Sequence, residues 1–203
     1  MGIGLYFQKQ KDLLRPGKII AGSLSFLFEN KNRPLVLGFA AGLILLFFFG
    51  HYLKDFVVLV LLATIGILST SYKRYMRVPP AVELVTFSTV MASLAYGPVV
   101  GAIFGAVVTV LAEVFNSGID AFIVGYIPAR AIVGFTAAFF PTTSIVTLGL
   151  LMSILYNAVA QPLYALQSDA ELKLKLIAFV VVNISSNFVI FAIAGGLVKG
   201  LIV

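Results

Sequence analysis

Two charged residues and a tyrosine have the strongest potential for chemistry in this sequence. Glu113 closes an apolar run, and Arg130 lies inside the next one, one helical turn after Tyr126. An ionisable side chain within an apolar segment is costly unless it reaches water, a partner or a cavity. Arg130 also follows Pro128, whose missing N–H frees an upstream helix carbonyl. These residues are therefore candidates for ligand binding.

The sequence leaves two interpretations open for each charged residue. Arg130 either forms a bidentate ion pair with Glu83, Glu113 or Asp120, or faces a cavity and binds an anionic ligand. Glu113 precedes the polar stretch NSGID by a turn or less, so it either reaches the membrane interface or contacts a ligand or partner. An intramembrane hydrolase or transferase would also need paired carboxylates, but Glu83, Glu113 and Asp120 follow no catalytic motif.

Amide side chains form two further patterns late in the chain. Asn157 and Gln161 are four residues apart, as are Asn183 and Asn187, so each pair shares a helix face. Uncharged amides in hydrocarbon must be paired, so both pairs are predicted to face the interior of a helical bundle. Either they line a ligand cavity or they bond to each other between helices.

Glycines recur every four residues at Gly97, Gly101 and Gly105. Small residues let transmembrane backbones approach closely, which is how helices associate in lipid. We therefore predict that these three glycines form a helix-packing face.

The composition identifies the elements that must position these residues. The chain has 203 residues, 61% hydrophobic and 11% charged, with a mean hydropathy of +1.08. These values are typical of a polytopic membrane protein rather than a soluble domain. The prediction is an all-α transmembrane bundle of six or seven helices. Its candidate segments are residues 34–50, 56–70, 81–96, 98–115, 121–140, 145–166 and 176–198.

The residue inventory argues against most enzymes. The chain has no cysteine and one histidine, His51. Thiolate metal sites and disulfides are therefore excluded, and a Ser-His-Asp triad has almost nothing to be built from. We expect no catalytic residues, no metal site and no cofactor.

Charge predicts orientation in the cell membrane. Residues 1–33 are basic, and the SYKRYMR stretch carries Lys73, Arg74 and Arg77, so both are expected in the cytoplasm. The HYLKD stretch at residues 51–55 would then be an external loop. We divide the chain into residues 1–33, a basic cytoplasmic segment that is either an amphipathic surface helix or a simple tail, and residues 34–203, the transmembrane domain. This asymmetry explains the net charge of +6, so membrane lipids rather than nucleic acid are the expected surroundings.

Residues 82–140 resemble the middle of the substrate-binding S components of energy-coupling factor transporters. The resemblance rests on a Gly-Pro step at Gly97, the following Gly-Ala and Gly at 101–102 and 105, the acidic Glu113, and a G-x-x-P-A-x-A-x-x-G pattern over residues 125–134. It implies a membrane subunit of about six helices that captures a vitamin, a related micronutrient or a metal ion. The metal-transporting branch is disfavoured, because it depends on an N-terminal histidine that this chain lacks.

The same resemblance implies partners. S components associate with a transmembrane T subunit and two ATPases, and this chain has no phosphate-binding loop of its own. Gly38 and Gly42, in the first apolar segment, would dock the T subunit. The alternative is a non-transporting multi-pass scaffold, similar to the MreD proteins of the cell-shape machinery, which would use its glycines and amides only to hold partners.

Overall fold

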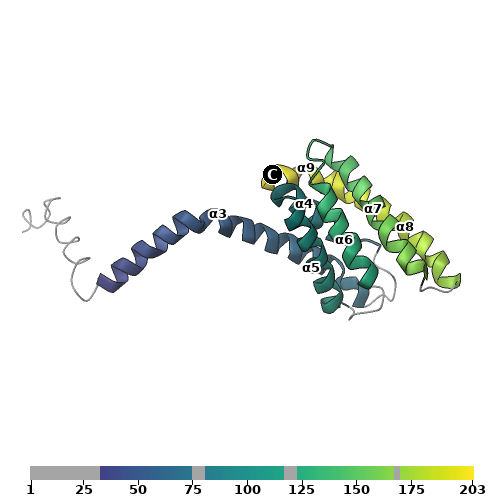
Figure 1. Cartoon of the computed structure of the whole chain (residues 1–203), viewed down its shortest axis with the longest axis horizontal. Coiled ribbons are helices and arrows are strands. Elements are labelled where there is room, and N and C mark those ends of the chain that lie inside the picture. Colours follow the sequence, from purple (N-terminus) through teal and green to yellow (C-terminus); the bar gives the residue numbers. More distant parts are fainter. Residues whose placement is uncertain (1–32, 75–80, 117–122, 167–169) are drawn as a thin grey trace, which may run out of the picture. The chain divides into compact units, whose positions relative to one another are not determined.

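A computed structural model describes residues 33–74, 81–116, 123–166 and 170–203 (Figure 1). Within these ranges every regular element is a helix and no strand occurs, which confirms the predicted all-α class. In chain order the elements are α3 (Arg33–Ser69), η1 (Ser71–Arg74), α4 (Val85–Tyr96), α5 (Pro98–Asn116), α6 (Ile123–Ala137), α7 (Ile145–Leu166), α8 (Ala170–Ile190), the π-helical turn η2 (Phe191–Gly195) and α9 (Gly196–Ile202).

The chain divides into two compact units within α3, Met1–Asp55 and Phe56–Val203. Of the first unit the structure describes only residues 33–55, which are helical. The interpretation of residues 1–32 as a cytoplasmic surface helix or tail lies outside the described residues. All the residues of the candidate site described below belong to the second unit.

The predicted external loop at residues 51–55 is wrong, because the backbone is helical from Arg33 through Ser69. Lys54 and Asp55 lie within this helix, between the apolar residues Leu53 and Phe56. Two charged residues do not break a helix, since neither is a glycine or proline, and the flanking residues have ordinary helix propensities. The sequence pattern marked a change in polarity and not a turn.

Gly97 separates α4 from α5. Its φ of 88° lies in the left-handed region that glycine adopts readily, and its N–H donates to the carbonyl of Ser93 at 2.9 Å. Pro98 then begins α5, where a proline has no N–H to leave unsatisfied. The Tyr-Gly-Pro sequence therefore ends one helix and starts the next without a longer loop.

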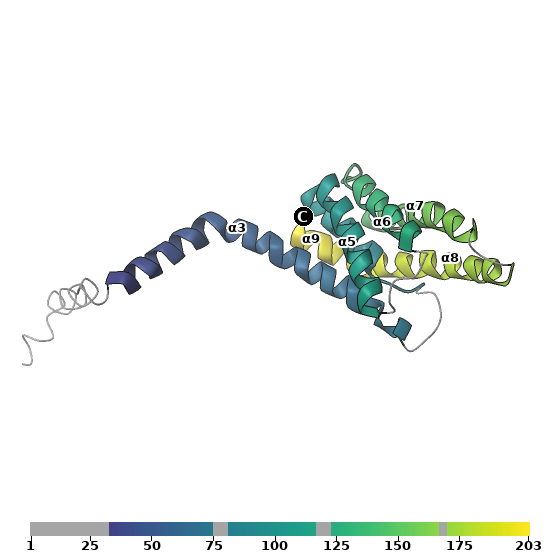
Figure 2. The same ribbon diagram turned by 60° about the horizontal axis from the view of Figure 1, so that its bottom comes forward.

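Four described helices are long and apolar enough to cross a membrane, and they identify the chain as a membrane protein. These segments are Tyr52–Ser69, Pro98–Phe115, Ile145–Leu166 and Leu176–Ile202. The shorter apolar helices α4 and α6 belong to the second unit, and α7 and α8 run side by side in both ribbon views (Figures 1 and 2). The number six or seven stays a prediction.

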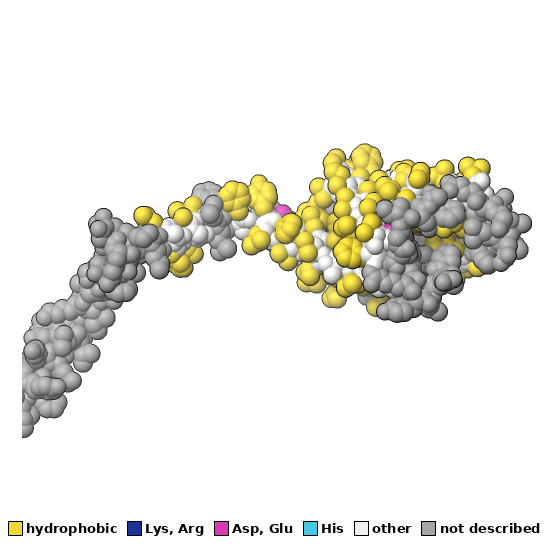
Figure 3. Space-filling model, turned by 90° about the horizontal axis from the view of Figure 1, so that it is seen from below, with side chains coloured by type: hydrophobic (Ala, Val, Ile, Leu, Met, Phe, Trp, Pro, Cys, Tyr) yellow, Lys and Arg dark blue, Asp and Glu magenta, His cyan; other side chains and the backbone are white. Residues whose placement is uncertain are grey.

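Polarity in the second unit is arranged for a lipid environment. Large apolar side chains such as Val99, Ile103 and Leu197 are exposed, and hydrophobic atoms cover most of the described surface seen in Figure 3. By contrast, thirteen polar or charged residues among those that the structure describes are buried. Since a soluble protein avoids large exposed apolar patches, this pattern indicates that the outer faces contact lipid and that polar chemistry is confined to the interior.

Candidate ligand site in the second unit

Glu83 begins the site by capping α4. Its Oε2 accepts hydrogen bonds from the backbone N–H groups of Val85 at 2.6 Å and Thr86 at 3.2 Å. These are among the N–H groups that a helix leaves without an internal partner, and a carboxylate there also faces the positive end of the helix dipole. Leu84, at the N-cap, has no polar side-chain atom for this purpose. The carboxylate of the preceding residue supplies the acceptor instead.

Glu83 also holds Arg130. Nη2 of Arg130 donates to Oε1 of Glu83 at 2.7 Å, and the two side chains are only 4% and 3% exposed. The hydroxyl of Thr86 donates to the same Oε1 at 2.6 Å and accepts a hydrogen bond from Nη1 of Arg130. Glu83, Thr86 and Arg130 thus form a closed set of bonds that joins the start of α4 to the middle of α6.

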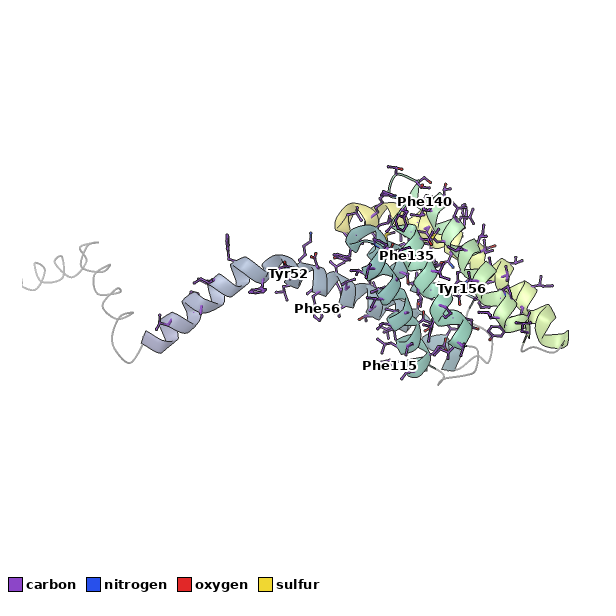
Figure 4. The ribbon with its side chains drawn as sticks, in the orientation of Figure 1. Tyr52, Phe56, Phe115, Phe135, Phe140 and Tyr156 are labelled. Atoms are coloured by element: carbon purple, nitrogen blue, oxygen red, sulfur yellow. The ribbon has the colours of Figure 1, made fainter. Side chains whose placement is uncertain are left out.

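Aromatic rings complete this environment. The guanidinium carbon of Arg130 lies 3.6 Å from the centre of the Tyr156 ring, a cation–π contact between α6 and α7. Figure 4 labels Tyr156. Tyr126, one turn before Arg130, has its ring 6.4 Å from that of Tyr156 and 5.4 Å from that of Tyr164. The ring of Tyr126 therefore lies between that of Tyr164 and that of Tyr156, which contacts the buried arginine.

A small cavity of about 30 Å³ adjoins these groups. Its polar lining includes Glu83, Glu113 and Arg130, which come from the start of α4, the end of α5 and the middle of α6. The remaining lining residues are Thr70, Val85, Thr109, Ala112, Tyr126, Tyr156 and Phe179. The volume is enough for about two water molecules, and the polar lining provides the partners that buried water needs. We call this set of lining residues the ion-pair site.

Glycines set the distance between the helices at the ion-pair site. A side-chain carbon at Gly105 of α5 would lie 2.7 Å from the carbonyl oxygen of Arg130, and one at Gly101 would lie 2.6 Å from that of Gly134. A side-chain carbon at Gly134 would overlap the backbone of Gly101 in the same way. Any larger residue at these positions would push α6, which carries Arg130, away from α5.

The amide side chains form a separate group, the amide network, made of Asn157, Gln161, Asn183 and Asn187. Nδ2 of Asn157 donates to Oδ1 of Asn183 at 2.9 Å, and Nε2 of Gln161 donates to Oδ1 of Asn157 at 3.2 Å. Nδ2 of Asn187 donates to the carbonyl of Asn183 at 2.9 Å. The network therefore ties α7 to α8 and joins residues that the sequence had grouped only in pairs.

The structure thus separates the predicted ligand-binding residues. Glu113, Tyr126 and Arg130 line the 30 Å³ cavity, whereas the four amides do not. Asn157 and Gln161 instead line an apolar groove of about 500 Å³ between α7 and α8. Of the two interpretations of Arg130, the structure contains the ion pair, and its partner is Glu83. The pair is not bidentate as predicted, because Nη1 of Arg130 donates to Thr86 and only Nη2 contacts the carboxylate. Asp120 lies outside the described residues.

The predicted glycine roles also separate. Gly101 and Gly105 lie against α4 and α6, but Gly97 does not belong to this packing face, because it forms the turn before α5 and a side-chain carbon there would meet no described atom within 4 Å. Gly38 and Gly42 lie on α3 in the first unit, where both are exposed.

No role in the site was predicted from the sequence for Thr86, Thr109 or Tyr156. A signal for Glu83 and Thr86 was present, since an acidic residue just before an apolar helix favours a helix N-terminus. No sequence signal could show that Tyr156 faces Arg130, because that contact depends on how α6 and α7 pack.

Comparison with models of known protein families, with curated proteins and with solved structures finds no match to this chain.

Proposed function

We propose that this chain is the membrane-embedded substrate-binding subunit of an uptake system for a small solute such as a vitamin or related micronutrient. The observation that carries the proposal is the ion-pair site, where Glu113, Tyr126 and Arg130 line one cavity inside an apolar bundle. Ionisable groups are expensive in a membrane protein, and they mark solute and ion pathways when they face a cavity.

The lining of the cavity suits a ring-bearing polar solute. The rings of Tyr126 and Tyr156 supply flat apolar faces, and the carboxylates, the guanidinium and Thr109 supply hydrogen-bonding groups. A binding site of mostly apolar walls with a few polar groups is the usual design for small molecules. Since 30 Å³ accommodates only water-sized groups, a vitamin-sized solute requires the surrounding helices to move apart.

Glu83 and Arg130 have a supporting role in this proposal. Both oxygens of Glu83 accept two hydrogen bonds each, so this carboxylate is committed to α4, Thr86 and Arg130. A buried arginine that has lost its counter-ion is strongly destabilising. The pair therefore keeps Arg130 charged and in place at the cavity wall, while Glu113 and Tyr126 contact the solute.

Energy and docking come from partners in this proposal. The sequence has no phosphate-binding loop, so separate ATPase subunits hydrolyse ATP, and a T subunit docks against the exposed Gly38 and Gly42. We place the protein in the cytoplasmic membrane with its N-terminus in the cytoplasm. Labelling of single cysteines on this cysteine-free chain tests that orientation directly.

One observation favours the second candidate, a non-transporting scaffold similar to MreD proteins. The amide network makes its hydrogen bonds within the protein, from α7 to α8, as expected of residues that only hold helices together. A scaffold of this kind needs no solute. The two candidates therefore differ in whether the ion-pair site is occupied.

Native mass spectrometry of gently purified protein, followed by denaturation and identification of the released small molecules, tests the proposal. Glu113→Gln and Tyr126→Phe remove one charge or one hydroxyl from the cavity and retain side-chain volume. Asn187→Leu is the matched control, since Asn187 is equally buried but lies outside the cavity. We expect a stoichiometric solute in the wild type and in Asn187→Leu, and at least about tenfold less in Glu113→Gln, as the loss of a charged contact predicts.

Two results would contradict the proposal. Wild-type protein without any solute, co-purifying with membrane partners that include no ATPase, would favour the scaffold. A solute retained equally in all three variants would place binding elsewhere in the molecule.

A further inference from the structure

Two side chains of α8 reach across to the backbone of residue 81. Nδ2 of Asn183 donates to the carbonyl oxygen of Ala81 at 3.0 Å, and Oγ of Ser186 donates to the same oxygen at 3.1 Å. Asn183 is fully buried. These bonds join residues about a hundred positions apart in the chain, and Ala81 begins the 81–84 segment that leads into α4.

The other side of the 81–84 segment is held by residues at the end of α3 and in η1. The hydroxyl of Tyr72 donates to the carbonyl of Val82 at 2.8 Å, and the N–H of Leu84 donates to Oγ of Ser69 at 2.9 Å. Burial raises the pKa of the Tyr72 phenol, an effect that the hydrogen bond to Val82 opposes, so the phenol remains a donor at neutral pH. The backbone at 81, 82 and 84 is thus hydrogen-bonded by side chains from two directions.

Glu83 lies between these anchors and is the residue on which Arg130 depends. Its carboxylate accepts four hydrogen bonds from three residues, and each requires the backbone at 83 to be correctly placed. Ala81 is only two residues from Glu83, and two residues span at most about 7 Å even when the chain is fully extended, so a displacement of Ala81 reaches Glu83 directly. The anchor at Ala81 therefore bears on the geometry of the ion-pair site.

We propose that Asn183 is a positioning residue for the ion-pair site, acting through the carbonyl of Ala81 on Glu83 and so on Arg130. Its amide divides into two functions: Oδ1 accepts the bond from Asn157 that ties α7 to α8, and Nδ2 fixes the 81–84 segment. The amide network is then more than a link between helices. This inference rests on the proposed function only in assuming that the ion-pair site binds a solute. Its test uses no solute, so a failure of this inference can be told from a failure of the proposed function.

The opposing account is that Asn183 serves helix association alone. Under that account, removing its side chain would loosen α7 against α8 but leave the 81–84 segment as rigid as before. Asn157→Ser breaks the bond between Asn157 and Asn183 and keeps the bond to Ala81, so it separates the two functions.

A nitroxide spin label at Val82→Cys, read by electron paramagnetic resonance, tests the proposal. The chain has no other cysteine, and Val82 is 51% exposed, so the label attaches at one accessible position. The variant is Asn183→Ser, whose hydroxyl is too short to reach Ala81 but bonds within its own helix. The matched control is Asn187→Ser, the same change one turn later at an equally buried residue whose amide donates only to the carbonyl of Asn183 among the described bonds.

We expect the mobile component of the spectrum to rise about twofold or more in Asn183→Ser, as for a segment that has lost an anchor. Asn187→Ser and Asn157→Ser should match the wild type. If Asn183→Ser does not fold, Asn183→Gln serves as the second variant, because its longer side chain displaces the amide from Ala81. A label as immobile in the folded Asn183 variant as in the wild type overturns the proposal, and so does equal mobilisation by Asn187→Ser.

Discussion

The ion-pair site and the amide network are two buried polar groups in one apolar bundle, and they are built differently. The ion-pair site lines a cavity, and its opposite charges connect the start of α4 with α6 and α7. The amide network joins α7 to α8 through neutral side chains. The two groups are equally buried, but breaking the first would leave an unpaired charge and breaking the second an unpaired neutral amide.

That difference is one of energy. Removing one partner of a buried ion pair leaves an uncompensated charge, which costs about 3–5 kcal/mol. Removing one neutral amide leaves an unpaired dipole, and hydrogen bonds between membrane helices contribute only about 0.6 kcal/mol on average and about 2 kcal/mol at most. A membrane protein can thus use amides to hold helices at little risk, while a buried charge pair is justified where a charge is needed. Changes at each group measure this contrast.

The largest effect is expected for Arg130→Ala. Glu83 would lose its counter-ion inside the bundle, and the free energy of unfolding should fall by about 3–5 kcal/mol. Unfolding in mixed micelles of a mild detergent and SDS gives this value. The double variant Arg130→Leu with Glu83→Leu removes both charges and should recover part of the loss. A double variant as unstable as the sum of its single changes would show that the pair has no coupling, and would remove the contrast between the two regions.

Gly105→Ala should have the next largest effect, because it acts on the ion-pair site through the backbone. The added carbon would lie 2.7 Å from the carbonyl of Arg130 and 2.8 Å from Thr89, so α5 and α6 must separate. Overpacking of this kind costs about 1–3 kcal/mol. Gly200→Ala is the control, since its added carbon meets no described atom within 4 Å, and helix propensity predicts that it stabilises by up to about 1 kcal/mol. An equal fall in the thermal unfolding midpoint of both variants would contradict close packing at Gly105.

A smaller loss is expected for Asn157→Leu in the amide network. The change leaves Oδ1 of Asn183 and Nε2 of Gln161 without the partner that each has now. The expected cost is about 1–2 kcal/mol, measured by the same unfolding assay. A loss as large as that of Arg130→Ala would show that the amides are as critical as the ion pair.

The smallest effect is expected for Asn187→Leu. Asn187 donates to the carbonyl of Asn183 within the same helix, and its Oδ1 has no partner among the described residues. Replacing it with an apolar side chain of similar volume should change the free energy of unfolding by less than about 1 kcal/mol in either direction. A clear destabilisation in that assay would indicate a bond at Oδ1, such as one to a buried water, and would extend the amide network by one member.

The sequence predicted the helices better than their contacts. The apolar runs at residues 98–115 and 145–166 coincide with α5 and α7 almost to the residue, and Gly97 and the Pro-Thr-Thr-Ser stretch mark where these helices begin. The loop at residues 51–55 was wrong, since a single glycine, Gly50, followed by a change in polarity is not enough to end a helix.

For the site, the sequence identified polar residues that must avoid lipid but could not assign their partners. Three carboxylates were equal candidates for Arg130, and the choice of Glu83 depends on α4 starting two residues later and packing against α6. The i, i+4 spacing grouped Asn157 with Gln161 and Asn183 with Asn187, but the bond between Asn157 and Asn183 depends on how α7 meets α8. Spacing gives the face of a helix, and only packing gives what that face meets.

Modification of a single cysteine at Thr109 tests most directly the claim that the ion-pair site binds a solute. Thr109 lines the cavity, Cys is close to Thr in size, and the chain has no other thiol. The control is Val107→Cys, on an exposed part of the same helix. We predict that Thr109→Cys protein retains the co-purified solute until a small alkylating reagent modifies the cysteine, and that bound solute slows this modification. Val107→Cys protein should keep its solute after modification. Undiminished solute in fully modified Thr109→Cys protein would contradict the account.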